Sequence, residues 1–332
     1  KVLLQAQEVL PKDDPTLIYR SAKLAFRENR LEKVKDSLER VDPEKLPLKV
    51  KKGYSELLAK TYDKLGLFSN AFTQFEITNK IAKQSPEALK VDGQRYFEKV
   101  SQLIRSWSNT AEVKWPENQA PNNQPSLAFL IGFPRSGTTL LDTILRSHPK
   151  VCVIEEKPIV AAMRKHIGSL PTAEFLTHLN NHQIASLSEV YFEELYSHIT
   201  IDSSHQIIID KLPLNIINVG LIHRVFPNSK FILALRHPYD CTLSCFMQNF
   251  VLNDAMANFF TLQQSAELYN ATMFLWKSYN SALNMQVCKL KYEDLILDLQ
   301  GTVEPLLNFL GLDWNDNLLN YQQTALSRER IH

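Results

Sequence analysis

Cysteine is scarce in this chain of 332 residues, which contains only four. They are too few for a disulfide framework in a protein of this size, and none forms a C-x-x-C pair. His178 and His182 share a spacing of four, but no Cys, Asp or Glu completes a metal-binding pattern with them. We therefore expect no bound metal, and free thiols in a reducing compartment, which favours the cytoplasm. The four are Cys152, Cys241, Cys245 and Cys288.

Long apolar runs are also missing. No stretch reaches the roughly 18 residues that a membrane-spanning helix needs. Hydrophobic residues make up 44% of the chain and charged residues 22%, which is typical of a globular protein. Arginine and aromatic residues are not interleaved, so no nucleic acid is expected as a partner. Because the chain begins at Lys1 rather than Met, we expect the native N-terminus to lie upstream, which leaves a removed signal or anchor open.

Residues 1–107 lack strand-like alternation and are rich in Ala, Leu, Lys and Glu, which predicts helices only. Two copies of one pattern follow each other there, and both resemble the small and aromatic packing positions of a tetratricopeptide repeat. A generic helical bundle is the alternative. The resemblance implies a protein partner. The net positive charge of this part has two explanations, solvated helix faces or a docking surface for an acidic partner. The copies comprise Ala22, Ala25, Asn29, Val34 and Leu38, then Leu58, Ala59, Tyr62, Gly66, Ala71 and Phe75.

A segment rich in Pro, Asn and Gln then predicts a linker at residues 118–126, between a helical repeat domain (1–117) and a second domain (127–332). In the second domain strands alternate with helices, which predicts a P-loop-type α/β domain with a central parallel sheet. Its ligand should lie at the carboxyl ends of the strands. The expected strands are Leu127–Ile131, Val151–Ile154, Gln206–Ile209, Phe231–Leu235 and Val287–Leu290.

The first of these strands leads into a glycine-bounded loop and then a helix. This layout presents backbone N–H groups and a helix N-terminus to an anion. Gly132, four residues and Gly137 fit the Walker A pattern, but Thr138 stands where that pattern has its lysine. The loop carries its cation at Arg135 instead.

The loop sequence F-P-R-S-G-T-T resembles the 5′-phosphosulfate loop of sulfotransferases, whose donor is 3′-phosphoadenosine 5′-phosphosulfate (PAPS). The resemblance implies that residues 135–139 bind the phosphosulfate. Arg236 closes a predicted strand and precedes Ser244, which resembles the 3′-phosphate motif; a guanidinium and a hydroxyl suit a terminal phosphate. Tyr292, in a K-Y-E-D-L segment, and Ser327, in the first part of a C-terminal donor loop, complete the set. The chain ends inside that loop, so we expect its C-terminus to be truncated. The implied donor-binding residues are Arg135, Ser136, Gly137, Thr138, Thr139, Arg236, Ser244, Tyr292 and Ser327.

Two further segments resemble the tyrosylprotein sulfotransferase branch. Lys211 follows one predicted strand and is the implied general acid; a solvated charge is its alternative. The pair Glu155-Glu156 follows another strand, and the resemblance puts the general base on Glu156; a surface acid that pairs with Lys157 is the alternative. Because adjacent side chains point in different directions, we expect only one of the two carboxylates to face the pocket. Arg135 is the third implied catalytic residue, which stabilises the leaving 5′-phosphate.

These features predict a sulfotransferase that moves a sulfuryl group from PAPS to an acceptor hydroxyl. The sulfuryl group carries less negative charge than a terminal phosphoryl group, so side-chain cations are expected to replace Mg²⁺. Tyrosylprotein enzymes have an Arg that helps hold the acceptor peptide where this chain has Pro158. The acceptor therefore stays open between a protein tyrosine, a sugar hydroxyl and a small metabolite. The alternatives are a P-loop nucleotide or small-molecule kinase, and a repeat adaptor with an inactive nucleotide-binding domain.

Overall fold

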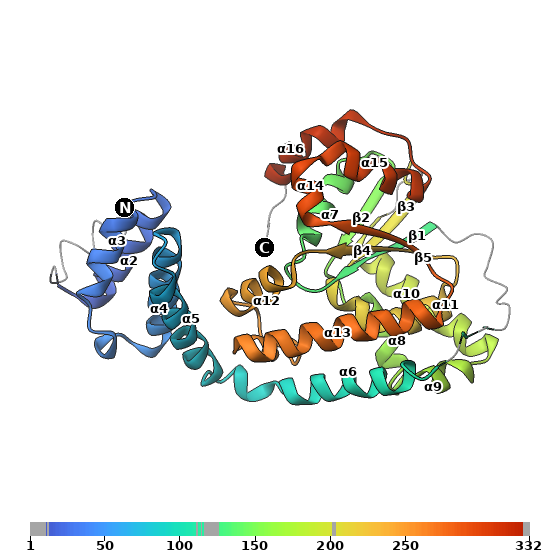
Figure 1. Ribbon diagram of the computed structural model, residues 1–332, viewed down its shortest axis with the longest axis horizontal. Coiled ribbons are helices and arrows are strands. Elements are labelled where there is room, and N and C mark those ends of the chain that lie inside the picture. Colours follow the sequence, from blue (N-terminus) through green and yellow to red (C-terminus); the bar gives the residue numbers. More distant parts are fainter. Residues whose placement is uncertain are drawn as a thin grey trace. The chain divides into compact units, whose positions relative to one another are not determined.

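The structure, a computed structural model, describes residues 11, 13–110, 112, 113, 115, 126–200 and 204–327. The chain divides into two compact units, which are described separately (Figure 1). We call residues 1–96 with 246–265 the helical unit, and residues 97–245 with 266–332 the α/β unit. The division falls inside helix α6 (Gly93–Trp107), upstream of the predicted boundary. All of the predicted linker except Ser126 lies outside the described residues, so the boundary near residue 118 stays a prediction.

The helical unit contains two helix pairs, α2 (Pro15–Arg27) with α3 (Leu31–Glu39) and α4 (Leu48–Lys64) with α5 (Phe68–Lys83). The two turns between paired helices match: Asn29 and Gly66 both have positive φ, at 56° and 75°. Apart from Asn29 and Gly66, which are exposed in the turns, the residues of the two sequence copies are buried in the core between the helices. This supports an internal repeat, while the tetratricopeptide family itself stays a prediction.

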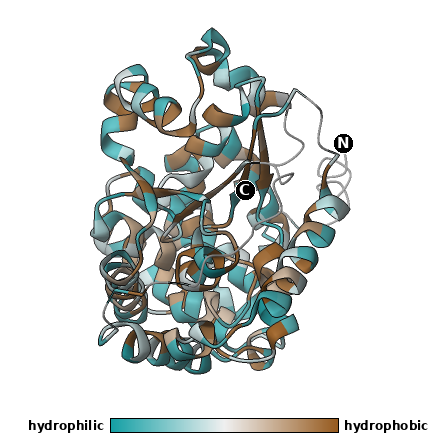
Figure 2. Cartoon of the chain, turned by 90° about the vertical axis from the view of Figure 1, so that its right-hand side faces the viewer, coloured by the Kyte–Doolittle hydropathy of each residue, from teal (hydrophilic) through white to brown (hydrophobic). Residues whose placement is uncertain are grey.

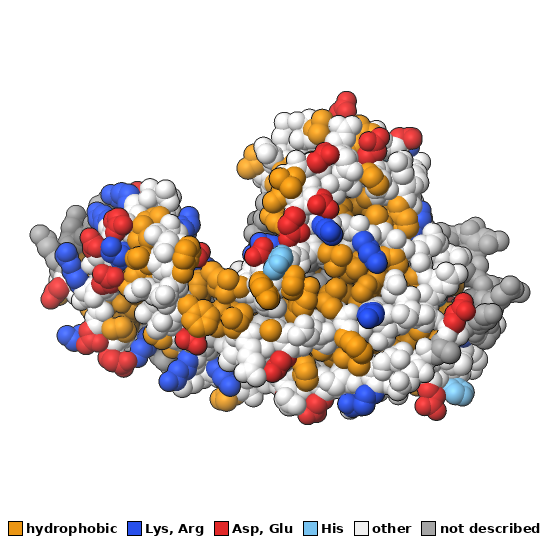
Figure 3. Space-filling model, in the orientation of Figure 1, with side chains coloured by type: hydrophobic (Ala, Val, Ile, Leu, Met, Phe, Trp, Pro, Cys, Tyr) orange, Lys and Arg blue, Asp and Glu red, His pale blue; other side chains and the backbone are white. Residues whose placement is uncertain are grey.

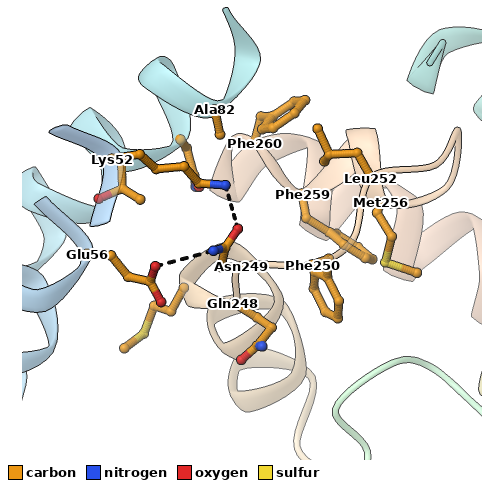
Figure 4. Close-up of a pocket in the computed structure, with 13 residues that line it drawn as sticks. Lys52, Glu56, Ala82, Gln248, Asn249, Phe250, Leu252, Met256, Phe259 and Phe260 are labelled. Carbon is orange, nitrogen blue, oxygen red and sulfur yellow. Dashed lines mark hydrogen bonds between the residues drawn. The ribbon is translucent and has the colours of Figure 1, made fainter. Parts of the chain in front are cut away.

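The helical unit also contains a segment from far along the sequence, residues 246–265, which includes the short helix η4 (Met256–Phe259). Phe246 is 1% exposed, lies in the same core as Phe75, and stacks on Phe72 with ring centroids 5.2 Å apart. Figure 4 shows the pocket where this segment meets α4 and α5. There the Asn249 side chain accepts a hydrogen bond from Lys52 Nζ (2.6 Å) and donates one to Glu56 Oε2 (3.3 Å). The sequence pattern indicated none of these contacts.

The α/β unit is built on a five-stranded, all-parallel sheet of order β2-β3-β1-β4-β5, and all five predicted strands are confirmed (Figure 1). Every residue of β1 after Ser126 is buried, because helices cover both faces of the sheet. Figure 2 shows the strands as strongly hydrophobic ribbons. The order reverses at β1, which has β3 on one side and β4 on the other, and such a switch point is where open parallel sheets bind ligands. The strands are β1 (Ser126–Gly132), β2 (Val151–Glu155), β3 (Ile207–Lys211), β4 (Lys230–Leu235) and β5 (Gln286–Lys291).

The two faces of the sheet have different cores. On one face, Ala128, Leu130 and Ile209 pack among aliphatic residues of α7 (Thr138–Arg146) and α15 (Leu299–Leu310). On the other face, Phe129 contacts the rings of Tyr191 and Phe226. The alternation of side chains along β1 therefore places neighbouring residues in different cores.

The remaining helices connect or follow the strands of the sheet. Helix α10 (Asn181–His198) begins at a capping box that Asn180 and Gln183 form. After β3 the chain forms η3 (Pro213–Asn218) and then α11 (Val219–Val225). No described helix is both long and apolar enough to span a bilayer. The other helices are α8 (Ile159–Ile167), α9 (Ala173–Thr177), α12 (Pro238–Met247), α13 (Leu262–Ala282), α14 (Tyr292–Leu297) and α16 (Tyr321–Ser327), with 3-10 turns η1 (Pro43–Lys45), η2 (Ala88–Lys90) and η5 (Asp316–Asn320).

Candidate active site

The loop between β1 and α7 has a glycine at each end, Gly132 and Gly137, and two residues with left-handed backbone, Arg135 and Gly137. Gly137 has φ 91° and caps α7, and a Cβ on it would lie 2.4 Å from Cδ2 of Tyr292. A Cβ on Gly132 would lie 2.7 Å from both Ala234 O and Ser136 Oγ. Arg135 has φ 69°, which is uncommon for a residue with a side chain and is concentrated at functional sites. Both glycines are therefore required by close approach, and the loop forms a tight cradle at the N-terminus of α7.

Two buried polar atoms, one in this cradle and one next to it, have no protein partner among the described residues. They are Ser136 Oγ, on a residue 2% exposed, and Arg236 Nε. An unpaired buried donor costs on the order of 1–3 kcal/mol, so such atoms usually serve a ligand or water. Thr138 is also buried, at the first turn of α7, and Thr139 is half-buried. The donors of residues 136–139 and the helix N-terminus thus fit a bound anion.

Arg236 follows β4, at the same edge of the sheet as the loop. Its Nη1 donates a hydrogen bond to the Arg135 carbonyl oxygen (3.3 Å), and its Nη2 lies 3.4 Å from Asp240 Oδ2. Ser244, on α12, accepts a hydrogen bond from Arg135 Nε (3.0 Å). The structure therefore brings the predicted 5′ and 3′ groups together, although Ser244 contacts Arg135 rather than Arg236.

Tyr292 begins α14, where its ring lies between two parts of the predicted donor site. The Arg236 guanidinium lies 4.7 Å from the centroid of this ring, and Gly137 packs against its edge. Ser327 ends α16, and its side chain lies outside the described residues. Thr324, on the same helix, shares a 2.8 Å hydrogen bond with Ser147 next to α7. Tyr292 thus fixes the loop and Arg236, while a donor contact of Ser327 stays a prediction.

Lys211 is the last residue of β3 and lies between two carboxylates. Its side chain is 0% exposed, and Nζ lies 3.0 Å from Glu155 Oε1 and 2.8 Å from Glu156 Oε1. The expectation that only one carboxylate faces the site is therefore wrong. Glu156 has φ 51°, so the chain leaves the extended conformation after Glu155 and the second side chain returns to the same side. The sequence pattern assumes an extended strand and gives no signal for a left-handed Glu.

Other residues hold the site and were not predicted. Glu293 Oε1 accepts a hydrogen bond from the His237 backbone N–H (2.8 Å). Partial burial raises the pKa of Glu293, but the backbone N–H groups of His237 and Glu293 and the Arg236 charge bring it below its usual value. The thiols of Cys241 and Cys245 lie 3.9 Å from the Arg236 carbonyl oxygen and 3.5 Å from the Pro134 carbonyl oxygen, so α12 contacts both binding segments. Burial raises the pKa of both thiols, that of Cys241 to about 12. Only the Y-E-D-L pattern pointed towards Glu293.

Asp210, next to Lys211 in β3, is completely buried and its Oδ2 accepts a hydrogen bond from the Tyr191 hydroxyl (3.2 Å). Burial raises the pKa of this carboxyl from 3.8 to about 7, although the Tyr191 hydrogen bond lowers it. Between pH 4 and 7 the folded state therefore binds a proton that the unfolded state has lost. The stability associated with protonated Asp210 is complete below about pH 4 and is lost as the pH rises through about 7.

We expect Asp210→Asn to remove this pH dependence, because the amide mimics the neutral carboxyl and keeps an acceptor for Tyr191. The unfolding free energy of the native chain, relative to the variant, should fall by up to about 4 kcal/mol between pH 4 and 8. Urea unfolding of both proteins across this range measures the difference. Parallel pH profiles of the two proteins would contradict this, because they would show that Asp210 is ionised in the folded as well as the unfolded state over this range.

No group of three or more His, Cys, Asp or Glu side chains that could hold a metal occurs in the described ranges. The chemistry of the cluster is carried by Lys211, Glu155 and Glu156, beside the cationic side chains Arg135 and Arg236. All five lie at or just after the carboxyl ends of β1, β2, β3 and β4. This arrangement can bind an anion, donate a proton or hydrogen bond from Lys211, and accept a proton on a carboxylate.

The chain is similar in sequence to several known proteins. An uncharacterized protein of Aquifex aeolicus is 27% identical over 81% of this chain and 36% of its own length. Nodulation protein NoeE of Sinorhizobium fredii is 31% identical over 36% of this chain and 31% of its own length. Protein-tyrosine sulfotransferase 2 of Gallus gallus is 24% identical over 67% of this chain and 59% of its own length. The chain thus spans about a third of the first two relatives and less than two thirds of the third.

Among solved structures, the sulfotransferase domain from the curacin biosynthetic pathway aligns with a TM-score of 0.40 and 19% identity, over 60% of this chain and 78% of that one. The family model described as "Sulfotransferase family" matches residues 126–316, which are more than half of the chain and include the cradle, Glu156, Lys211 and Arg236. The chain belongs to the sulfotransferase family.

Proposed function

We propose that this protein transfers the sulfuryl group of PAPS to an acceptor hydroxyl. The observation that carries the proposal is the contact of one buried lysine, Lys211, with Glu155 and Glu156 beside an anion cradle that has no Walker lysine. A kinase cradle needs that lysine and a bound Mg²⁺ for its phosphates. Family membership supports the transferase activity. We infer PAPS as the donor from the anion-binding residues of the cradle and from Arg236.

The described residues fit a donor with two anionic ends. The 5′-phosphosulfate would be held by the 136–139 backbone, the orphaned Ser136 hydroxyl and the Arg135 guanidinium. The 3′-phosphate would be held by the Arg236 guanidinium, whose Nε has no protein partner, with Ser244 nearby on α12. When bound, the donor supplies an activated sulfuryl group whose leaving group is a 5′-phosphate.

The roles of the side chains follow from their positions. Glu156 is 47% exposed and takes the proton of the approaching hydroxyl. Lys211 directs an N–H at the departing oxygen and is able to donate its proton. Arg135 remains charged and stabilises the same oxygen, since a guanidinium is a poor acid. The site also holds these groups in place before the reaction, which lowers the orientational cost.

For the acceptor, we propose the hydroxyl of a protein tyrosine. The support is the likeness to protein-tyrosine sulfotransferases. A macromolecular partner would bind through the helical unit, as the predicted repeats imply. Pro158, the N-cap of α8, departs from the tyrosylprotein pattern and supplies no cation for a peptide. On the face of the helical unit that Figure 3 shows, basic and acidic side chains are intermixed, which favours solvated helix faces over a single acidic docking partner.

Calorimetry tests the donor class. We expect metal-independent binding of 3′-phosphoadenosine 5′-phosphate, the desulfated product, and much weaker binding of ATP, because only the former offers a phosphate to Arg236. Tighter, Mg²⁺-dependent binding of ATP would indicate a kinase instead. A radiolabelled-donor screen over tyrosine peptides, sugars and small phenols then tests turnover. Binding without transfer to any acceptor class would favour the adaptor.

A further inference from the structure

Lys211 occupies an unusual position for an ammonium group. Its side chain is fully buried, and its Nζ contacts the carboxylates of both Glu155 and Glu156. A buried charge without an anionic partner costs several kcal/mol in proteins. The position of the Lys211 ammonium therefore depends on the carboxylates that contact it.

The two carboxylates are held differently. Glu155 belongs to strand β2, lies directly opposite Lys211 in the parallel pairing with β3, and has a side chain 23% exposed. Glu156 lies just beyond the strand, where its backbone N–H donates to the Lys211 carbonyl oxygen (2.8 Å), and its side chain is 47% exposed. Glu155 is thus fixed by the sheet on the inner side, whereas Glu156 reaches towards solvent.

We propose that Glu155 is a positioning residue that holds the Lys211 ammonium while Glu156 takes the acceptor proton. This inference rests on the proposed function. In the transfer, the proton of the acceptor O–H moves to Glu156, the acceptor oxygen bonds to sulfur, and the bond from sulfur to the 5′-phosphate oxygen breaks. Glu156 becomes neutral at that moment and no longer balances the charge of Lys211. Glu155 neither gains nor loses a proton, so it keeps the ammonium aimed at the departing oxygen.

The neighbouring carboxyl of Asp210 is not placed to take over this task. Asp210 precedes Lys211 in β3, so its side chain leaves the strand on the opposite face, where it bonds to Tyr191. Arg135 and Arg236 are cations and cannot hold an ammonium. Glu155 is therefore the residue whose removal should affect Lys211 without touching the donor cradle.

The kinetic test uses Glu155→Gln, Lys211→Ala and the double variant. We expect Glu155→Gln to lower kcat about tenfold, within the range of measured couplings between contacting residues. The donor KM and the affinity for 3′-phosphoadenosine 5′-phosphate should stay within about twofold, because residues 135–139 and Arg236 are unchanged. In the Lys211→Ala background, Glu155→Gln should cause no further loss. Glu189→Gln, the same change on an exposed position of α10, is the matched control and should match the native kcat.

A second measurement needs no turnover. Glu155→Gln should lower the melting temperature of the native chain by a few degrees, because Lys211 loses one of its two anionic partners, and by much less in the Lys211→Ala background. Glu155→Asp, which keeps the charge on a shorter side chain, should retain more kcat than Glu155→Gln. Three results would each overturn the positioning role. The first is a kcat of Glu155→Gln equal to that of the native chain, and the second is an equal effect of Glu155→Gln in the native and the Lys211→Ala backgrounds. The third is a lower kcat for Glu155→Asp than for Glu155→Gln. If the native chain transfers no sulfuryl group, the proposed function fails, and this inference with it.

Discussion

Glu156→Ala is expected to lower kcat by on the order of 10²–10⁴-fold, which is the usual contribution of a general base. Glu156 is the more exposed of the two carboxylates at Lys211, so it is the one that an acceptor hydroxyl meets first. The variant leaves Glu155 as the partner of Lys211, so the fold and the donor cradle should persist. The affinity for 3′-phosphoadenosine 5′-phosphate should therefore stay within about twofold, as a binding titration would show.

The matched comparison for this prediction is Glu156→Gln, which keeps the size and removes the base. Glu156→Ala and Glu156→Gln should lower kcat to the same extent, because each lacks the proton acceptor. Turnover equal to that of the native chain in either variant would remove Glu156 from the mechanism. A larger loss in Glu155→Gln than in Glu156→Gln would exchange the roles of the two carboxylates.

Arg236→Ala is expected to weaken binding of 3′-phosphoadenosine 5′-phosphate about 100-fold, since a charge-assisted contact to a buried or half-buried phosphate contributes several kcal/mol. Adenosine 5′-phosphosulfate lacks the 3′-phosphate, so its affinity should change by no more than about threefold. Calorimetry with both nucleotides gives the two ratios. The side chain is well placed for such a contact because Tyr292 supports its guanidinium and its Nε is unpaired.

Two controls separate the phosphate contact from a disturbed loop, since Arg236 also donates to the Arg135 carbonyl oxygen. Arg236→Lys keeps the charge but loses the planar fork, and should fall between the native chain and Arg236→Ala. Ser244→Ala removes the acceptor of Arg135 Nε, and the part of its effect that passes through the loop should be equal for both nucleotides. An equal loss for both nucleotides in Arg236→Ala would contradict the 3′-phosphate assignment.

The sequence determined the elements of the α/β unit because their signals are local. Five apolar runs became five strands, and the residues that follow four of them, including Arg135, Glu156, Lys211 and Arg236, meet at one edge of the sheet. A parallel sheet places all carboxyl ends together, so a residue directly after a strand is brought to the site whatever lies between the strands. The motif match added the chemistry expected there.

Other features depended on contacts between residues far apart in sequence. The burial of Phe246 and the position of Asn249 beside Lys52 and Glu56 in the helical unit involve separations of more than 160 residues. Periodicity describes only neighbours along the chain, so it assigned this segment to the second domain. The division inside α6 arises in the same way, because contacts and not linker composition define a compact unit.

The sequence by itself determined the chain's family, the parallel sheet and most of the residues at its carboxyl edge, since these rest on local patterns and a compact loop motif. Only the tertiary structure decided how those residues meet. The left-handed backbone at Arg135 and Glu156 depends on the surrounding contacts, which over-determine an otherwise unfavourable conformation. That bend brings Glu156 back beside Glu155, so a fully buried Lys211 has two carboxylate partners where the sequence predicted one.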